Sequence, residues 1–269
     1  MRKGLLIYDQ NDIEKNKQSI AMFQDYAKQI GIDLQLVSSD DEDVLWVEQT
    51  SNPEPVVINR SRSYELALEF EKITPFVFNC STVTLYGNDK FAANAFLAEK
   101  GIETIPTYSF DNYPDEFPLI GKTKSGHGGA EVYLVNSAKE AEELIDTFGE
   151  NIIFQDYIES GNSDLRVYVV GDKILCGMLR SSGSDFRSNF SLGGSAEFVQ
   201  VPESVKEQVD VVVKALGGVA YCGIDFLKKE DGWIFNEIED VVGARMVYAG
   251  TDLDPIGEFV NYIGKVVGR

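Results

Sequence analysis

Three carboxylates stand on two apolar segments that read as the strands of one hairpin. GWIFNEIED, residues 232–240, carries Glu237 and Glu239 two positions apart, and side chains with that spacing share a strand face. YCGIDFL, residues 221–227, adds Asp225, and the KKEDG between the segments predicts a turn. Clustered acids repel one another unless hard cations compensate them, and oxygen ligands on rigid strands suit Mg²⁺ beside phosphates. A hairpin end whose acids only face water is the alternative.

A glycine-rich loop between two predicted strands has the composition of a phosphate cradle. GKTKSGHGGAEV, residues 121–132, places Lys122 at a strand end, followed by Gly126, Gly128 and Gly129. Glycines let backbone N–H groups approach a phosphate, and a lysine supplies the opposite charge. The spacing matches neither a P-loop nor a dinucleotide fingerprint, so we expect a hairpin flap. A flexible turn with solvated lysines is the alternative.

Arginines on a second predicted hairpin indicate an anion clamp. DLRVYVVGDKILCGMLR, residues 164–180, predicts two strands around the turn GDK, which brings Arg166 and Arg180 at the outer ends together. The following SDFRSN adds Arg187 and Asn189. Guanidinium groups bind carboxylate and phosphate bidentately, so arginines that converge in an acidic protein favour such a clamp. Surface ion pairs with the many acids are the alternative.

Composition excludes several other classes of function. The net charge of −20 repels nucleic acids and anionic membranes, so we expect neither as a partner. The three cysteines are far apart and form no CxxC, which argues against a disulfide framework and a thiolate metal site. His127 is the one histidine and lies on the glycine loop, a poor place for a Ser/His/Asp triad. With no apolar run typical of a signal peptide or a membrane span, we expect a cytoplasmic protein.

The predicted elements form a small α/β layer followed by a larger α+β part. Strands alternate with helices up to about residue 85, which is typical of a parallel sheet, whereas strands dominate from residue 118 onward. In the first part we expect strands at 4–9, 32–37, 56–60 and 76–79 and helices at 12–30 and 63–72. Further helices are expected at 88–100, 137–148, 203–216 and 251–266.

Taken in order, the motifs resemble those of the ATP-grasp superfamily, and most of all those of the RimK-like ligases. They are GNDKF, the glycine flap, QDYI, DLRVYVVGDKI, DFRSN followed by GGSAE, and GIDFL followed by NEIE. The resemblance covers roughly residues 56–269 and implies an ATP-grasp fold behind a small N-terminal domain. The implied parts are an N-terminal α/β domain at 1–85, a central subdomain with the flap at 86–157 and a C-terminal subdomain with the metal and phosphate site at 158–269.

The resemblance also implies which residues bind ATP. Adenine would lie at a hinge between the two subdomains, the phosphates would meet two lysines and the glycine flap, and the ribose would lie beside an acid. The matching positions are Gln155, Asp156, Tyr157 and Ile158 at the hinge, Lys90, Lys122, Gly126, Gly128 and Gly129 at the phosphates, and Asp164 at the ribose.

Catalytic groups and metal ligands follow from the same resemblance. The positions around the γ-phosphate and the acyl phosphate match Arg166, Arg180, Arg187 and Asn189. The acids that match ligands of one or two Mg²⁺, with Mn²⁺ as a substitute, are Asp225, Glu237 and Glu239. Glu239 departs from the family pattern, in which Asn is usual, and DVVGARM stands where a proline and a glycine normally follow. We therefore expect the acceptor-binding wall, which includes Arg245, to differ from that of the named ligases.

The implied activity is an ATP-dependent carboxylate-amine ligation. A substrate carboxylate would attack the γ-phosphate of ATP to give an acyl phosphate and ADP, and an amine would then displace phosphate. The partners would be an amino-acid or peptide carboxylate and an amine acceptor, in a homodimer or homotetramer. Two alternatives remain, a phosphotransferase that acts on a small molecule and a non-catalytic nucleotide-binding module.

Overall fold

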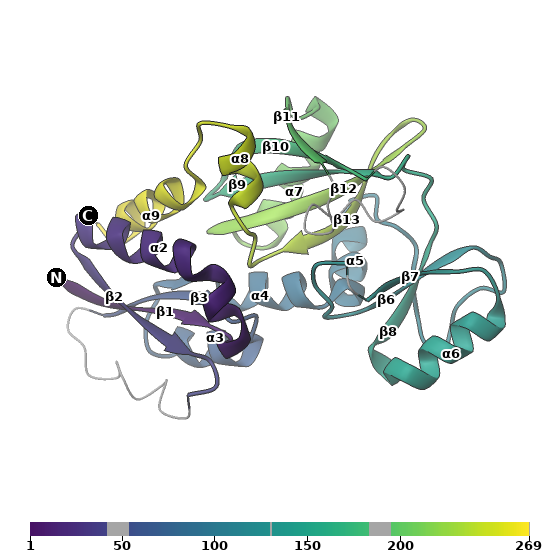
Figure 1. The fold of residues 1–269 in the computed structure, drawn as a ribbon, viewed down its shortest axis with the longest axis horizontal. Coiled ribbons are helices and arrows are strands. Elements are labelled where there is room, and N and C mark those ends of the chain that lie inside the picture. Colours follow the sequence, from purple (N-terminus) through teal and green to yellow (C-terminus); the bar gives the residue numbers. More distant parts are fainter. Residues whose placement is uncertain (42–53, 130, 183–194, 269) are drawn as a thin grey trace.

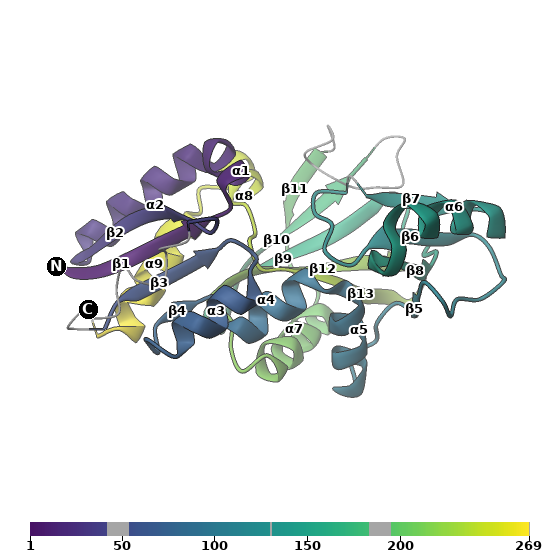
Figure 2. The same cartoon turned by 90° about the horizontal axis from the view of Figure 1, so that it is seen from below.

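The N-terminal part is a parallel four-stranded sheet with helices on both sides. The computed structural model describes residues 1–41, 54–129, 131–182 and 195–268 (Figure 1). The sheet has the order β2-β1-β3-β4, and α2 and α3 lie on opposite sides of it (Figure 2). This confirms the predicted α/β layer. The elements are β1 Arg2–Tyr8, α1 Gln10–Ile13, η1 Glu14–Asn16, α2 Lys17–Gln29, β2 Ile32–Ser38, β3 Val56–Arg60, α3 Tyr64–Glu71 and β4 Val77–Phe78.

The single helix expected at 12–30 is wrong in its first turns, because η1 separates α1 from α2. The side-chain amide of Asn16 donates to the carbonyl oxygen of Asp12 at 2.8 Å. A side chain that occupies a carbonyl in this way competes with the helical backbone bond.

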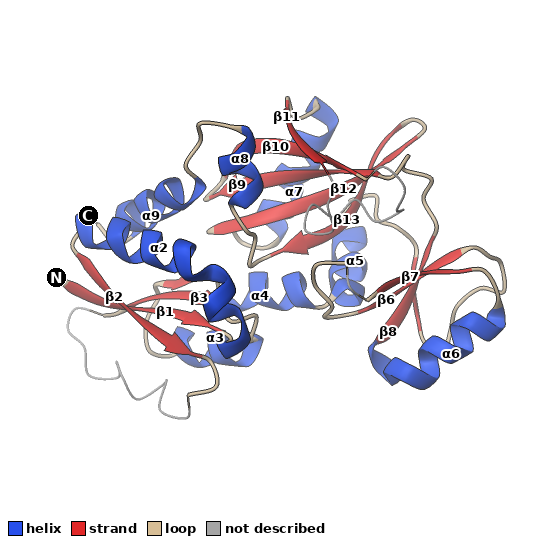
Figure 3. Cartoon of the chain, in the orientation of Figure 1, coloured by secondary structure: helices blue, strands red, loops and turns tan. Residues whose placement is uncertain are grey.

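Two antiparallel sheets and the helices that accompany them make up the rest of the described residues (Figure 3). The larger has the order β11-β10-β9-β12-β13, and the smaller, which carries the flap, has the order β5-β8-β6-β7. The strands are β5 Thr107–Ser109, β6 Leu119–Thr123, β7 Val132–Val135, β8 Ile152–Asp156, β9 Ser163–Val170, β10 Lys173–Ser181, β11 Ser195–Val199, β12 Tyr221–Lys229 and β13 Gly232–Glu239. The helices are α4 Ser81–Asn88, α5 Lys90–Glu99, α6 Ala138–Phe148, η2 Gly149–Asn151, α7 Glu203–Ala215, α8 Arg245–Gly250 and α9 Pro255–Val266.

Several of these elements differ from the expectation. The predicted helix at 88–100 is preceded by a separate helix, α4, and the strand β5 was not predicted. The helix expected at 251–266 is α9, which begins four residues later because Asp254 caps it by accepting from the backbone N–H of Gly257, and the short helix α8 before it was not predicted. The three predicted hairpins are confirmed as the antiparallel pairs β6/β7, β9/β10 and β12/β13.

Strand alternation sorts the large sheet into an apolar face and a charged face. Leu165, Ile224 and Ile238 join the core under α4, α5 and α7. Arg166 and Asp225 are the next residues along their strands, so they project from the opposite face. The same pleat that buries the core therefore gathers the charged side chains on one surface.

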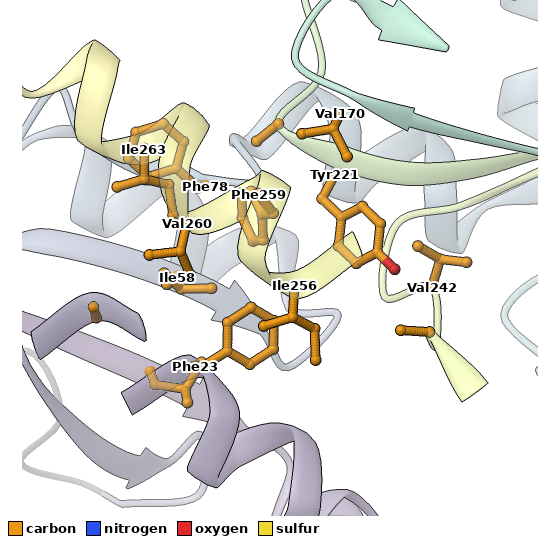
Figure 4. Close-up of a cluster of buried hydrophobic side chains, with 14 of the residues drawn as sticks. Phe23, Ile58, Phe78, Val170, Tyr221, Val242, Ile256, Phe259, Val260 and Ile263 are labelled. Atoms are coloured by element: carbon orange, nitrogen blue, oxygen red, sulfur yellow. The ribbon is translucent and has the colours of Figure 1, made fainter. Parts of the chain in front are cut away.

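The last helix packs back onto the N-terminal layer. Phe259 of α9 lies 5.9 Å from the ring of Phe23 in α2 and 5.4 Å from that of Tyr221 in β12, measured between ring centroids. Figure 4 shows these rings in one cluster with Phe78 and Ile256. This shared core fixes the N-terminal layer against the large sheet. The domain limits expected near residues 85 and 157 stay predictions.

Candidate active site

A cavity of about 510 Å³ collects nearly all of the predicted site residues. Its wall includes the segment Gln155–Ile158 at the end of β8, together with apolar side chains from both antiparallel sheets, Ile120, Val132 and Leu227. We call this apolar part of the wall the apolar slot, and it suits a flat ring whose edge can bind the backbone groups of the strand end. The charged part of the wall holds Lys90, Lys122, Asp164, Arg166, Arg180, Glu237, Glu239 and Arg245.

Four charged residues of this wall, together with Asp225 behind it, form a network of alternating charges. Arg166 donates to both carboxylate oxygens of Asp225, from Nε at 2.8 Å and from Nη2 at 2.7 Å. Arg180 donates to the same Oδ2 at 2.6 Å and also binds both oxygens of Asp164. Arg166 reaches Glu239 at 3.3 Å. We call these five residues the buried network.

Strand register explains why the network forms. Arg180 lies directly opposite Asp164 across β9 and β10, and Asp225 lies opposite Arg166 across β9 and β12. Asp225 is also opposite Glu237 in β13. The prediction that the arginine-bearing ends meet is confirmed, and the acids that face them come from the neighbouring strands.

The network shifts the pKa of its two aspartates in opposite directions. Burial favours the neutral form of both, but for Asp225 the two guanidinium groups outweigh it and hold the pKa below the usual range. For Asp164 burial dominates over Arg180 and raises the pKa to about 6. Asp225 is 0% exposed, so its charge is balanced entirely by the two arginines and not by water.

Lys90 and Lys122 approach the cavity from different elements. Lys122 of β6 is buried, and this burial lowers its pKa to about 8 although Glu237 opposes the shift. Its Nζ donates to Oδ1 of Asn236 at 3.2 Å. Lys90, the first residue of α5, donates to the carbonyl oxygen of Gly126 at 2.5 Å and lies 3.7 Å from the carboxylate of Glu237. The two lysines therefore connect the flap with β13.

The glycine flap folds over the same cavity. Gly126, Gly128 and Gly129 all line it, and the last two have φ angles of 71° and 72°, where glycine is favoured. His127 places Nδ1 3.8 Å from Oε1 of Glu239, and burial lowers the pKa of the imidazole. The predicted hairpin flap thus contacts the strand that carries the acids.

The three predicted metal ligands do not form one open cluster. Glu237 and Glu239 line the cavity, whereas Asp225 does not, because both of its oxygens accept from arginines. Among the described residues, no three His, Cys, Asp or Glu side chains stand together in a way that could hold a metal ion. Two carboxylates that face the cavity still fit the oxygen chemistry that Mg²⁺ prefers. The assignment of all three as ligands stays a prediction.

Some cavity residues were missed by the sequence reasoning. Asp12, Lys15 and Arg62 reach the wall from the N-terminal layer, and Asn236 reaches it from β13. Asn236 is the extra residue of a β-bulge opposite Asp225. No residue pattern in the sequence predicts this bulge. The N-terminal residues carried no motif. Arg187 and Asn189, both predicted as catalytic, lie outside the described residues.

A comparison with family models identifies the family to which the chain belongs. The model of the RimK-like ATP-grasp domain matches residues 88–263. The chain belongs to the RimK-like ATP-grasp family. It is 34% identical over 214 residues to a probable alpha-L-glutamate ligase 2 of Shewanella amazonensis, an alignment that covers 74% of this chain and 70% of the relative.

Solved structures of other ATP-grasp ligases share the fold. The D-alanine–D-alanine ligase of Bacillus anthracis matches with a TM-score of 0.72 at 14% identity, over 99% of this chain and 98% of that one. The ligase PsnB, in a complex with a phosphomimetic variant of its minimal precursor, Mg and ADP, matches with a TM-score of 0.68 at 14% identity over 98% of each chain. The predicted ATP-grasp fold is confirmed.

Membership of this family makes the chain an ATP-dependent, ADP-forming carboxylate-amine ligase, as the motifs predicted. ATP and Mg²⁺ are the cofactors typical of the family, and the PsnB complex contains Mg with ADP. No helix within the described residues is long and apolar enough to cross a membrane.

Proposed function

We propose that this chain activates the carboxylate of an amino acid or peptide as an acyl phosphate and joins it to the amine of an amino acid. The observation that carries this proposal is the convergence of Lys90, Lys122, Arg166 and Arg180 on the cavity that Glu237 lines. Four cations beside a carboxylate, in a chain of net charge −20, form a site for a polyanion and its metal. L-glutamate is the first substrate to test, because the relative in Shewanella amazonensis is named a probable alpha-L-glutamate ligase.

The nucleotide would lie with its base in the apolar slot and its phosphates under the flap. Gln155–Ile158 would bind the base edge, with Ile120 and Leu227 packed on its faces. Lys122 and Lys90 would then exchange their present partners, Asn236 and Gly126, for phosphate oxygens. Asp164 would contact the ribose through a carboxylate oxygen that also accepts from Arg180.

Glu237 and Glu239 would hold Mg²⁺, and Asp225 would join them only by exchanging a guanidinium for the metal. A bound metal ion would neutralise part of the charge of the phosphates. One or two ions fit this scheme, and Mn²⁺ can replace Mg²⁺ in oxygen sites of this kind.

Arg166 and Arg180 would stabilise the charge that develops as the phosphoryl group moves to the donor carboxylate. Both guanidinium groups are fixed by carboxylates before any ligand binds, so little reorganisation remains for the transition state. Arg187 and Asn189 would complete this group. The flap would exclude water, which otherwise hydrolyses an acyl phosphate. The homodimer or homotetramer and the cytoplasmic location expected from the sequence stay predictions.

Phosphorus NMR with hydroxylamine as a surrogate amine tests the proposal. The protein is incubated with MgATP and pooled amino acids and short peptides, with L-glutamate as one separate sample. We expect ADP, phosphate and a hydroxamate that appear only when a carboxylate donor is present. A new phosphoester signal would instead identify a phosphotransferase, and ADP without hydroxamate would contradict an acyl phosphate.

A further inference from the structure

Arg245 differs from the other cations of the cavity wall. Within the part of the chain that the structure describes, Lys15 and Arg62 pair with Asp12 at 3.4 Å and 2.5 Å, and Lys90 pairs with Glu237. Arg166 and Arg180 are bound in the buried network, and Lys122 donates to Asn236. Arg245 lines the cavity and is exposed. Its side chain makes no hydrogen bond or ion pair with any described residue.

The backbone that carries Arg245 is held in place from three sides. The carbonyl oxygen of Asp240 accepts from the side-chain amide of Asn79 at 2.7 Å. The guanidinium of Arg60 donates to the carbonyl oxygen of Val242 at 2.8 Å. The hydroxyl of Tyr168 donates to the carbonyl oxygen of Gly243 at 2.9 Å. The backbone that leads to Arg245 is therefore fixed, and no described partner has to be displaced when its guanidinium binds an anion.

The position of Arg245 indicates which substrate it meets. The polyphosphate and the donor carboxylate need the cations around Glu237, whereas Arg245 lines the same cavity from the start of α8, after the segment that follows β13. Its exposure leaves it accessible to a second small molecule that enters from solvent. A guanidinium prefers a planar carboxylate, which it can bind through two parallel hydrogen bonds.

We propose that Arg245 binds the non-reacting carboxylate of the amine substrate, so that the enzyme selects free amino acids over simple amines and amino-acid amides. This inference rests on the proposed ligase function. Arg60 and Tyr168 are positioning residues, because they fix the loop and do not touch the substrate. The segment DVVGARM, where the chain departs from the family pattern, thereby sets acceptor specificity.

The test uses the full-length protein and one donor with three acceptors. Peptide-linked glutamate serves as the carboxylate donor, and L-glutamate, its α-amide and hydroxylamine serve as the amines. Arg245→Gln should lower kcat/KM for L-glutamate tenfold or more, mainly through KM, and should leave the α-amide and hydroxylamine reactions within twofold of wild type. Lys139→Gln, which removes an exposed cation of α6, is the matched control and should change none of the three.

The outcomes separate this inference from the proposed function. If the wild type forms no hydroxamate, the ligase proposal is overturned. The role of Arg245 can still be tested in that case by calorimetry, which compares the affinity for L-glutamate with that for its α-amide in the presence of a non-hydrolysable ATP analogue. Equal losses for all three amines in Arg245→Gln, or an unchanged preference for L-glutamate over its α-amide, would overturn the role of Arg245.

The positioning residues provide a second readout. Tyr168→Phe removes only the hydroxyl that holds the carbonyl of Gly243. We expect it to raise KM for L-glutamate several-fold in the wild-type background and to have no further effect in Arg245→Gln, because both act on one contact. Additive effects of the two substitutions would contradict the link between the loop and Arg245.

Discussion

The buried network and the outer wall of the cavity hold their charges in different ways. In the network, Asp164, Arg166, Arg180 and Asp225 are all at most 7% exposed, and each acid is bound by at least one guanidinium. On the outer wall, which we define as Asp12, Lys15, Arg62 and Arg245, the side chain of Lys15 is 75% exposed and Arg245 has no partner among the described residues. The charges of the network are thus fixed by one another, whereas the outer wall keeps exposed cations that a ligand can reach.

This difference follows from where the side chains originate. The network comes from strands of one sheet, and hydrogen-bonded register sets Arg180 opposite Asp164 and Arg166 opposite Asp225. The outer wall comes from α1, η1, the segment after β3 and the start of α8, which lie outside the strands, so no strand register sets its side chains opposite one another. We infer that reaction type depends on the sheet and that substrate choice depends on the wall around it.

The largest effect is expected from removing the acid at the centre of the network. Asp225→Asn leaves two buried guanidinium groups without their common counter-charge, so the free energy of unfolding should fall by about 3–5 kcal/mol. Urea denaturation measures it. Lys15→Gln on the outer wall is the control and should cost less than about 1 kcal/mol. Equal costs for the two variants would remove the contrast between the regions.

A large loss of turnover without a loss of fold is expected for Glu237→Gln. This carboxylate faces the cavity beside Lys90, so its charge serves the nucleotide and metal more than the core. We expect ADP formation to fall by about 100-fold, the order of effect of removing one electrostatic contact to a transition state. The ADP release rate is compared with that of Glu143→Gln on α6. Near-normal turnover would show that the metal assignment is wrong.

The pH dependence of nucleotide binding reports on Lys122. Burial lowers its pKa to about 8, and bound phosphates favour its charged form, so the affinity for ADP should fall as pH rises above about 8, by about tenfold per pH unit. Calorimetry between pH 7 and about pH 9.5 measures this dependence. Lys122→Arg keeps its charge over the whole range, so its affinity should stay flat. A flat profile in wild type would contradict a phosphate contact of Lys122.

The smallest effect is expected at the residue that departs from the family pattern. Glu239→Asn keeps an oxygen ligand but removes a charge that contacts Arg166 and His127. Because Arg166 retains both bonds to Asp225, we expect turnover to change by less than about tenfold and the Mg²⁺ concentration for half-maximal rate to rise. A loss as large as that of Glu237→Gln would give Glu239 a central role.

Local patterns in the sequence predicted the hairpins and their site residues. Turn residues between apolar runs identified β6/β7, β9/β10 and β12/β13, and period-two alternation placed Glu237 and Glu239 on one face. Both acids and both lysines indeed line one cavity. The helix α4 escaped prediction because its sequence, STVTLYGN, is short and rich in β-branched and polar residues.

Long-range pairing could not be predicted from the residues. The sequence does not show that β9 lies between β10 and β12, and this order sets Arg166 and Arg180 against Asp225. The same holds for the N-terminal layer, because Arg62 meets Asp12 across 50 positions only when β3 pairs with β1. Strand order and helix docking depend on the whole core, which no single motif encodes.

Oxygen transfer from the donor carboxylate tests the central claim most directly. A peptide donor whose reacting carboxylate carries ¹⁸O is incubated with MgATP, L-glutamate and the wild-type enzyme, and the released phosphate is analysed by the ¹⁸O-induced shift in its phosphorus NMR signal. If the carboxylate attacks the γ-phosphate and an amine then displaces phosphate, each phosphate carries one donor oxygen. Unlabelled phosphate released together with the amide product would contradict an acyl phosphate formed in this cavity.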